Sequence, residues 1–261
     1  MTARTVGTID ELFARERRED RPALVDGTGR GYDAHWLYTT AWKAGNFLRH
    51  SGVRRGVTVG VVGEGPLALL AFFGTTLLEG TTRFDPPPDM TDDERFRALV
   101  APIDRLDSYE LPPGAQRVGY GGKPEAPDVH HFDAGLWSEN PSFPPLDVDP
   151  DTIALEDDRG RYGHADLLEA ALAVVDDAAL ERGDRVAIRS PLSDARTIAG
   201  GVIAPLLADA VTVLPSDGDE PTPTEEVDAV VGGSDERDAE TVDDAGDTPV
   251  VDLESIPLDP R

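Results

Sequence analysis

One pattern of secondary-structure signals occurs twice in the chain, at an offset of about 130 residues. In each copy a short apolar strand and a tyrosine come before an amphipathic helix, and an Arg-Gly pair, a strand, a helix and another strand follow. The opening strand and tyrosine are 23–26 and Tyr32 in the first copy, and 153–156 and Tyr162 in the second. Strands that alternate with helices are typical of βαβ units. The repeat therefore predicts an α/β fold with two similar lobes of mostly parallel sheet flanked by helices.

The individual elements are predicted from hydrophobic spacing and from proline positions. Leu37, Ala41 and Leu48 recur at helical spacing, and Pro66 occupies the favoured first position of a second helix. The same criteria predict helices over 35–50, 91–100 and 193–207, and strands over 57–62, 81–84, 211–214, 227–231 and 249–253.

These elements divide the chain into four parts. The first lobe is predicted over 1–88, and the second lobe, its repeat, over 147–232. Between them, 89–146 is rich in proline and glycine and is predicted to be a connecting segment with loop and edge structure. The last part, 233–261, is an acidic C-terminal segment.

The chain is strongly acidic. It contains 51 Asp and Glu residues against 24 Lys and Arg residues, which gives a formal net charge of −27. Only Lys43 and Lys123 are lysines. Carboxylates keep a chain soluble, but their mutual repulsion destabilises the compact state unless salt screens it. This composition predicts a halophilic protein from a salt-loaded cytoplasm.

The composition also excludes several classes of partner and chemistry. Nucleic acids and anionic membranes attract proteins through basic patches, which this sequence lacks. The chain contains no cysteine, which excludes disulfides and thiolate chemistry. The N-terminus lacks the apolar core of a signal peptide, and the longest apolar stretch, 66–78, is too short to span a bilayer. We therefore expect a cytoplasmic protein that binds neither nucleic acid nor a membrane.

The order of several short motifs carries a family resemblance. A Gly-Tyr pair at 31–32, a helix that ends in Ser-Gly-Val-Arg-Arg-Gly at 51–56 and the strand 57–62 form the first group. Glu-Arg-Gly-Asp-Arg-Val at 181–186 and the apolar segment 203–210 form the second group. In this order they resemble the N-terminal part of AMP-forming acyl-CoA synthetases, which belong to the adenylate-forming superfamily. The resemblance implies two similar α/β subdomains, in agreement with the repeat.

The resemblance also implies an ATP-binding phosphate loop near residue 155. In the family this loop is rich in Ser, Thr and Gly and is followed by Lys, because backbone N–H groups, hydroxyls and an ammonium group surround the phosphates. Here the stretch 155–162 places Glu156, Asp157 and Asp158 at that point, and their charges would repel a triphosphate. The family's adenine and ribose motifs are missing, and its C-terminal domain with the catalytic lysine lies outside these 261 residues. No catalytic residue is assigned.

The leading interpretation is therefore an acyl-CoA synthetase-like protein that is noncatalytic alone. It would act as a paralogue or partner of a full-length synthetase. The alternative is an acyl- or nucleotide-binding subunit of an AMP-forming ligase whose active site is completed by another chain. The sequence does not identify a cofactor, so that remains unknown.

A third interpretation is a dinucleotide-binding module. Gly63 and Gly65 follow a strand and open a helix, in the spacing G-x-G-x-x-A, and Asp85 follows the next strand about 20 residues later. Pyrophosphate would then lie on the helix N-terminus and a ribose on Asp85. Against this, Glu64 adds a negative charge to the loop, and any strand-to-helix turn uses glycine for tight geometry.

Other candidates have simpler explanations. The loop 119–124 lacks the Ser or Thr that follows Lys in a phosphate loop. His130 and His131 could bind a metal with a nearby aspartate, but adjacent side chains rarely converge on one ion, so no metal site is assigned. Ser193 is predicted to cap the helix that follows it, because no G-x-S-x-G motif surrounds it.

Overall fold

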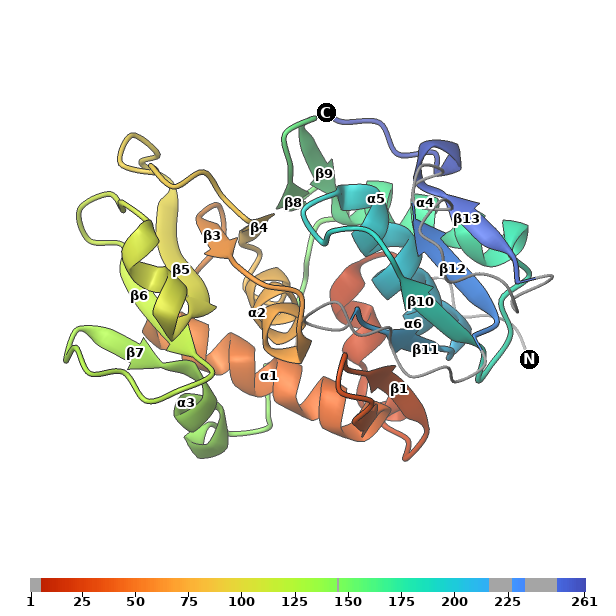
Figure 1. Ribbon diagram of the computed structural model, residues 1–261, viewed down its shortest axis with the longest axis horizontal. Helices are drawn as coiled ribbons and strands as arrows, with labels where there is room; N and C mark the ends of the chain where they lie inside the picture. The colour runs from red at the N-terminus through yellow and green to blue at the C-terminus, as the bar shows by residue number, and fades with distance from the viewer. Residues whose placement is uncertain (1–5, 145, 216–226, 233–247) are drawn as a thin grey trace. The chain divides into compact units, whose positions relative to one another are not determined.

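The computed structural model describes residues 6–144, 146–215, 227–232 and 248–261. The chain forms two compact units. We call Tyr38–Gly163 the central unit, and we call Met1–Leu37 together with His164–Arg261 the terminal unit. Each unit contains one mostly parallel sheet with helices packed on it (Figure 1).

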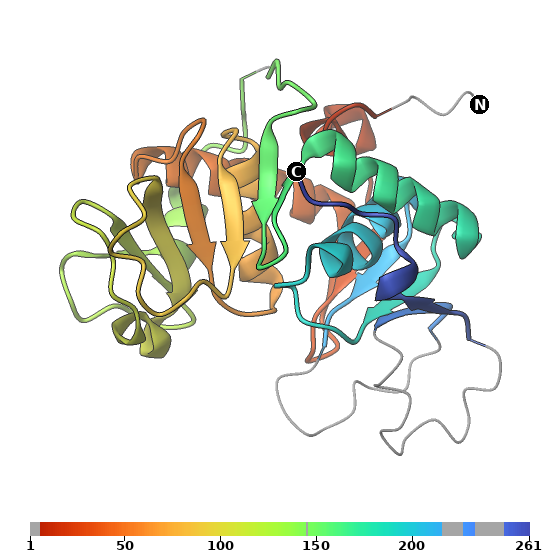
Figure 2. The same cartoon turned by 90° about the horizontal axis from the view of Figure 1, so that it is seen from above.

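The central unit is built on a seven-stranded sheet with the order β7-β6-β5-β3-β4-β8-β9. Only β9 runs antiparallel, and Figure 2 shows β3, β4 and β8 side by side in one direction. Helix α2 packs on β3 and β4, and α3 packs on β6 and β7. The elements are α1 (Ala34–His50), whose first turn belongs to the terminal unit, β3 (Thr58–Val61), α2 (Pro66–Thr76), β4 (Thr81–Phe84), β5 (Phe96–Pro102), β6 (Gln116–Tyr120), β7 (Val129–His131), α3 (Phe132–Ser138), β8 (Ile153–Glu156) and β9 (Arg161–Gly163).

The terminal unit is built on a six-stranded sheet with the order β13-β12-β10-β11-β1-β2, in which only β2 runs antiparallel. The strands predicted over 227–231 and 249–253 are confirmed as β12 and β13; the stretch between them lies outside the described residues. The elements are β1 (Pro22–Val25), β2 (Gly31–Asp33), α4 (His164–Asp177), β10 (Arg185–Ile188), α5 (Ala195–Ile198), α6 (Ala204–Ala208), β11 (Val211–Val213), β12 (Ala229–Gly232) and β13 (Val250–Asp252).

The two copies of the repeat exchange their opening hairpins. Strand β1 of the first copy pairs with β11 of the second, with Leu24 opposite Thr212. Strand β8 of the second copy pairs with β4 of the first, with Leu155 opposite Thr82. Each sheet therefore contains a hairpin from the other copy, and the structure divides the chain at other points than the predicted lobes 1–88 and 147–232. A strand's hydrophobic pattern shows that it is buried but does not identify its partner.

The segment predicted as a connector, 89–146, contributes three parallel strands to the central sheet, and this corrects both its role and the helix predicted over 91–100. Strand β5 lies between β3 and β6, and its residues 98–101 are all fully buried. A strand that is covered on both faces has a continuous apolar run without alternation, which resembles a helical stretch in sequence.

The second helix of the second copy is interrupted by one π-helical turn, Ala199–Ile203, between α5 and α6. Pro205 has no N–H to donate to the carbonyl of Gly201 four residues earlier, and the buried Thr212 hydroxyl donates to that carbonyl instead, at 3.1 Å. The cap of α5 is Asp194, whose carboxylate accepts from the Arg196 N–H, and not Ser193 as predicted.

Candidate functional site

The acidic stretch where the resemblance places a phosphate loop is the tight turn of the hairpin β8–β9. Asp157 organises this turn through one carboxylate oxygen, Oδ1. That oxygen accepts the N–H of Arg159 at 2.8 Å, the N–H of Gly160 at 3.0 Å and the hydroxyl of Tyr162 at 3.1 Å. The Asp157 N–H in turn donates to the Gly160 carbonyl at 2.9 Å. The backbone donors that would face a phosphate are thus bonded within the turn itself.

Ion pairs hold the other two carboxylates of this stretch. Glu156 is buried, and its oxygens lie 3.8 Å from an Arg83 nitrogen and 3.6 Å from Arg161 Nε. Asp158 is 95% exposed and bonds Arg83 at 2.9 Å. Two guanidinium groups, those of Arg83 and Arg161, therefore balance carboxylates of the turn.

The first copy of the repeat contains the same kind of turn, in which an aspartate accepts backbone N–H groups and a tyrosine hydroxyl. Asp26 Oδ1 accepts the N–H groups of Thr28 and Arg30, and Oδ2 accepts the Tyr32 hydroxyl at 2.8 Å. Burial, followed by this bond to Asp26, raises the pKa of Tyr32 to about 12. An aspartate that binds backbone N–H groups two residues on is a common turn former. Its presence in both copies indicates a structural role for the Asp–Tyr pair.

The two hairpin turns also correct the sequence alignment of the two copies of the repeat. Cross-strand pairing places Leu24 opposite Tyr32 and Leu155 opposite Tyr162, so that Leu24 corresponds to Leu155. The offset in the opening strands is therefore 131, and the second turn is one residue shorter. Asp157, rather than Glu156, is the counterpart of Asp26. The recurring Asp and Tyr at the two ends of each turn were the sequence signal that could have identified the pair.

Gly63, Gly65 and Asp85 lie at the carboxyl edge of the central sheet. Gly63 follows β3 and Asp85 follows β4, two adjacent parallel strands. The Gly63 N–H donates to the Asp85 carboxylate. Desolvation raises the pKa of Asp85, while the charge of Arg105 and the hydrogen bond from Gly63 act in the opposite direction. The structure thus brings Gly63 and Asp85 into contact, but the glycine donor that a phosphate would need is bonded to Asp85.

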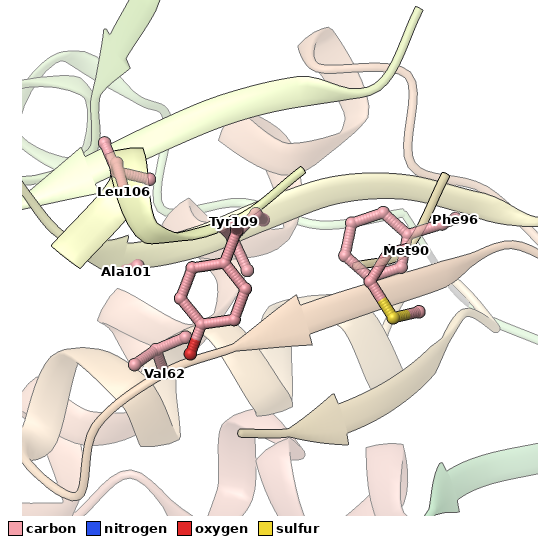
Figure 3. Packing of buried hydrophobic residues seen from close by; sticks show 7 residues of the cluster. Val62, Met90, Phe96, Ala101, Leu106 and Tyr109 are labelled. Atoms are coloured by element: carbon pink, nitrogen blue, oxygen red, sulfur yellow. The ribbon is translucent and has the colours of Figure 1, made fainter. Parts of the chain in front are cut away.

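Aromatic side chains fill this edge where the strand order reverses, between β3 and β5. Ligands of open α/β sheets bind at such points. Here Tyr120 donates its hydroxyl to the Val62 carbonyl at 2.5 Å, and a Cβ placed on Gly63 would lie 2.3 Å from that hydroxyl. Tyr109 packs with Val62 and Leu106 in an apolar cluster, its ring directed towards Val62 (Figure 3). Gly65, with φ −89°, is the N-cap residue of α2 and provides no side-chain hydrogen bond. The arrangement supports a packed strand-to-helix turn.

We expect Gly63→Ala to lower the free energy of unfolding by about 2 kcal/mol, because φ is +106° there and the new methyl group meets the Tyr120 hydroxyl. Tyr120→Phe removes that hydroxyl and leaves the ring carbon Cζ at 3.6 Å. Urea unfolding in molar KCl should therefore show the double variant to be more stable than the sum of the single effects by about 1 kcal/mol. Additive effects would contradict a clash with Tyr120.

The two adjacent histidines have different side-chain neighbours. His130 Nε2 lies 3.0 Å from the Gln116 side-chain oxygen, and His131 Nε2 lies 3.5 Å from Asp133 Oδ2. Within the described ranges, no group of three or more histidine or carboxylate side chains could hold a metal ion. In the same ranges, no helix is both long and apolar enough to cross a membrane.

Comparison with known proteins gives matches in structure. No protein-family model and no curated protein matches the sequence. The anthranilate CoA ligase AuaEII in complex with anthranoyl-AMP matches with a TM-score of 0.73 and 17% identity, over 87% of this chain and 49% of that one. ATP-bound MatB from Rhodopseudomonas palustris matches with a TM-score of 0.67 and 14% identity, over 85% of this chain and 49% of that one. The N-terminal subdomain of Klebsiella oxytoca NpsA in complex with anthranilyl-AMSN matches with a TM-score of 0.67 and 14% identity, over 87% of this chain and 59% of that one.

The chain thus has the α/β fold of the N-terminal part of adenylate-forming enzymes, and the predicted fold class is confirmed. It spans about half the length of AuaEII and of MatB. At identities of 14–17% the likeness is one of fold.

Proposed function

We propose that this protein is an acyl-CoA synthetase-like protein that does not form acyl adenylates alone. The observation that carries the proposal is the bonding of the turn after β8. Its Arg159 and Gly160 N–H groups donate to Asp157, whereas a phosphate loop needs such donors for the nucleotide. Opening the turn would break these bonds and still leave three carboxylates beside the triphosphate.

The proposed role is that of a paralogue or partner of a full-length synthetase in a high-salt cytoplasm. The fold supports the relation to synthetases, and the net charge of −27 supports the high-salt setting.

Calorimetric titration and an activity assay test the proposal. We expect no saturable binding of ATP or AMP in molar KCl, because the backbone donors of the turn are already bonded to Asp157. We also expect no ATP-dependent activation of any carboxylic acid. Far-UV circular dichroism verifies that the protein is folded. Turnover by the pure protein that is lost in Leu155→Pro would overturn the proposal, since proline there breaks the buried strand β8 between β4 and β9.

One finding favours the alternative, an acyl- or nucleotide-binding subunit completed by another chain. The NpsA structure is an N-terminal subdomain that holds anthranilyl-AMSN. If this alternative holds, the protein will co-purify with a synthetase and mixing will restore activity that neither chain has alone. The dinucleotide-binding interpretation predicts heat from a nicotinamide dinucleotide in the same titration; the bond between Gly63 and Asp85 argues against it.

A further inference from the structure

A cavity of about 170 Å³ opens in the central unit, on the side where β3, β4 and β8 begin. Arg55 comes before β3, Glu79 before β4 and Thr152 before β8. Thr81 of β4 and Arg161 of β9 complete the polar lining. Of these polar lining residues, Arg161 is the one that also contacts a carboxylate of the acidic turn, that of Glu156. The lining contains none of Gly63, Gly65 and Asp85, so the cavity is separate from the glycine turn.

Three polar atoms of these lining residues are buried and have no hydrogen-bond partner among the described residues. They are Glu79 Oε2, Thr152 Oγ1 and Arg161 Nε. Buried polar atoms in folded proteins nearly always have a partner, so each exception requires an explanation. Three exceptions on one cavity point to an occupant that both donates and accepts hydrogen bonds.

The two guanidinium groups retain donors for such an occupant. Arg55 Nε lies 3.4 Å from Glu79 Oε2, and Arg161 Nε lies 3.6 Å from Glu156. Charge-assisted hydrogen bonds are shorter, about 2.7–2.9 Å. These neighbours therefore attract the two arginines without forming a close hydrogen bond with the Nε donors. A guanidinium group is a planar fork of donors that matches a carboxylate.

The charges and the size of the cavity define the ligand class. Two arginines and Glu79 give the lining a net charge of +1, in a chain whose total is −27. An anionic group balances this charge, and a neighbouring donor satisfies Glu79. The volume of about 170 Å³ corresponds to roughly five or six water molecules at about 30 Å³ each. We propose that the cavity binds a small carboxylic acid that also carries a hydroxyl or amino group.

In this site the ligand carboxylate lies between Arg55 and Arg161, and the ligand hydroxyl or ammonium group donates to Glu79. The Thr152 hydroxyl bonds either group. This binding site does not depend on the proposed function, because it shares no residue with the backbone donors of the turn.

Calorimetric titration with lactate and alanine in molar KCl tests the proposal. We expect saturable binding of one of them, and at least tenfold weaker binding of propionate, which has the carboxylate without the second group. Arg55→Gln and Arg161→Gln should each weaken binding at least tenfold. Arg54→Gln is the matched control, since Arg54 is an exposed neighbour outside the lining, and it should bind like the wild type.

The same titration can overturn the proposal. If neither lactate nor alanine binds to protein shown to be folded by circular dichroism, water alone fills the cavity and the site does not exist. If propionate binds equally well, Glu79 recognises no donor. If Arg54→Gln weakens binding as much as Arg55→Gln, the effect is one of net charge and not of this cavity.

Discussion

Lowering the pH from 6.5 to about 4 is expected to remove about 3 kcal/mol from the free energy of unfolding through His164 alone. This side chain is fully buried at the start of α4, and burial lowers its pKa from 6.5 to about 4. Between these values the unfolded chain takes up a proton that the folded chain excludes. The stability is therefore complete above pH 6.5 and is lost as the pH falls towards 4.

The hydrogen bonding of His164 explains why the folded state needs the neutral ring. Its Nδ1 accepts the buried N–H of Ile9 at 3.1 Å, which leaves the ring proton on Nε2. Nε2 is buried and has no hydrogen-bond partner among the described residues. Protonation of Nδ1 would place two N–H groups against each other and bury a charge, which destabilises the docking of the N-terminal segment that begins with Ile9.

Urea unfolding at several pH values, with His164→Gln as the comparison, measures this effect. The amide oxygen of Gln can accept the Ile9 N–H but does not titrate. We expect the stability of the wild type to fall more steeply than that of the variant between pH 6.5 and 4, by about 3 kcal/mol in total. Because both proteins share all carboxylates, equal slopes would show that His164 is not the group responsible.

Gly74→Val is expected to cost about 3 kcal/mol of stability, because α1 and α2 are in close contact at this glycine. A Cβ placed on Gly74 would lie 2.8 Å from the Ala44 carbonyl carbon, 2.8 Å from the Gly45 nitrogen and 2.9 Å from Ala44 Cβ. Two of these atoms are backbone atoms of a helix, which cannot move aside as a flexible side chain can. Thermal or urea unfolding in molar KCl measures the loss.

Two further variants make this prediction specific. Gly122→Val is the matched control in the same unit, since its nearest neighbour is a side-chain carbon of Ile103 at 3.8 Å, and it should change stability little. Ala44→Gly removes one of the three contacts of Gly74→Val but leaves both backbone contacts, so the double variant should stay destabilised. Full rescue by Ala44→Gly would mean that the helices can separate at low cost.

Much of the fold follows from local signals. Pro66 begins α2, the strand predicted over 81–84 is β4, and helices α1 and α4 occupy the predicted places in the two copies of the repeat. These elements have strong signals, because one face of each helix is buried and proline marks a helix start. Phe96–Pro102 gave no such signal, since a strand covered on both faces shows no alternation.

The candidate site was only partly predictable. The three carboxylates at 156–158 and the glycines before α2 are plain in the sequence, and so is the conflict between acidic charge and a triphosphate. The sequence did not show that Asp157 binds the donors of its own turn. Nor did it show that Tyr120 fills the space above Gly63, because these two residues are 57 positions apart and meet through the pairing of β3, β5 and β6.

The repeat, the strands and helices within its two copies and the acidic character are properties of the amino-acid sequence, since local spacing and composition are sufficient to predict them. The tertiary structure decided which strands are neighbours and which side chains meet. It joined β1 to β11 and β4 to β8, and it gathered Arg55, Glu79 and Arg161 around one cavity. Pairing depends on which edges and side chains meet after the chain has folded, and these neighbours come from segments far apart in the sequence.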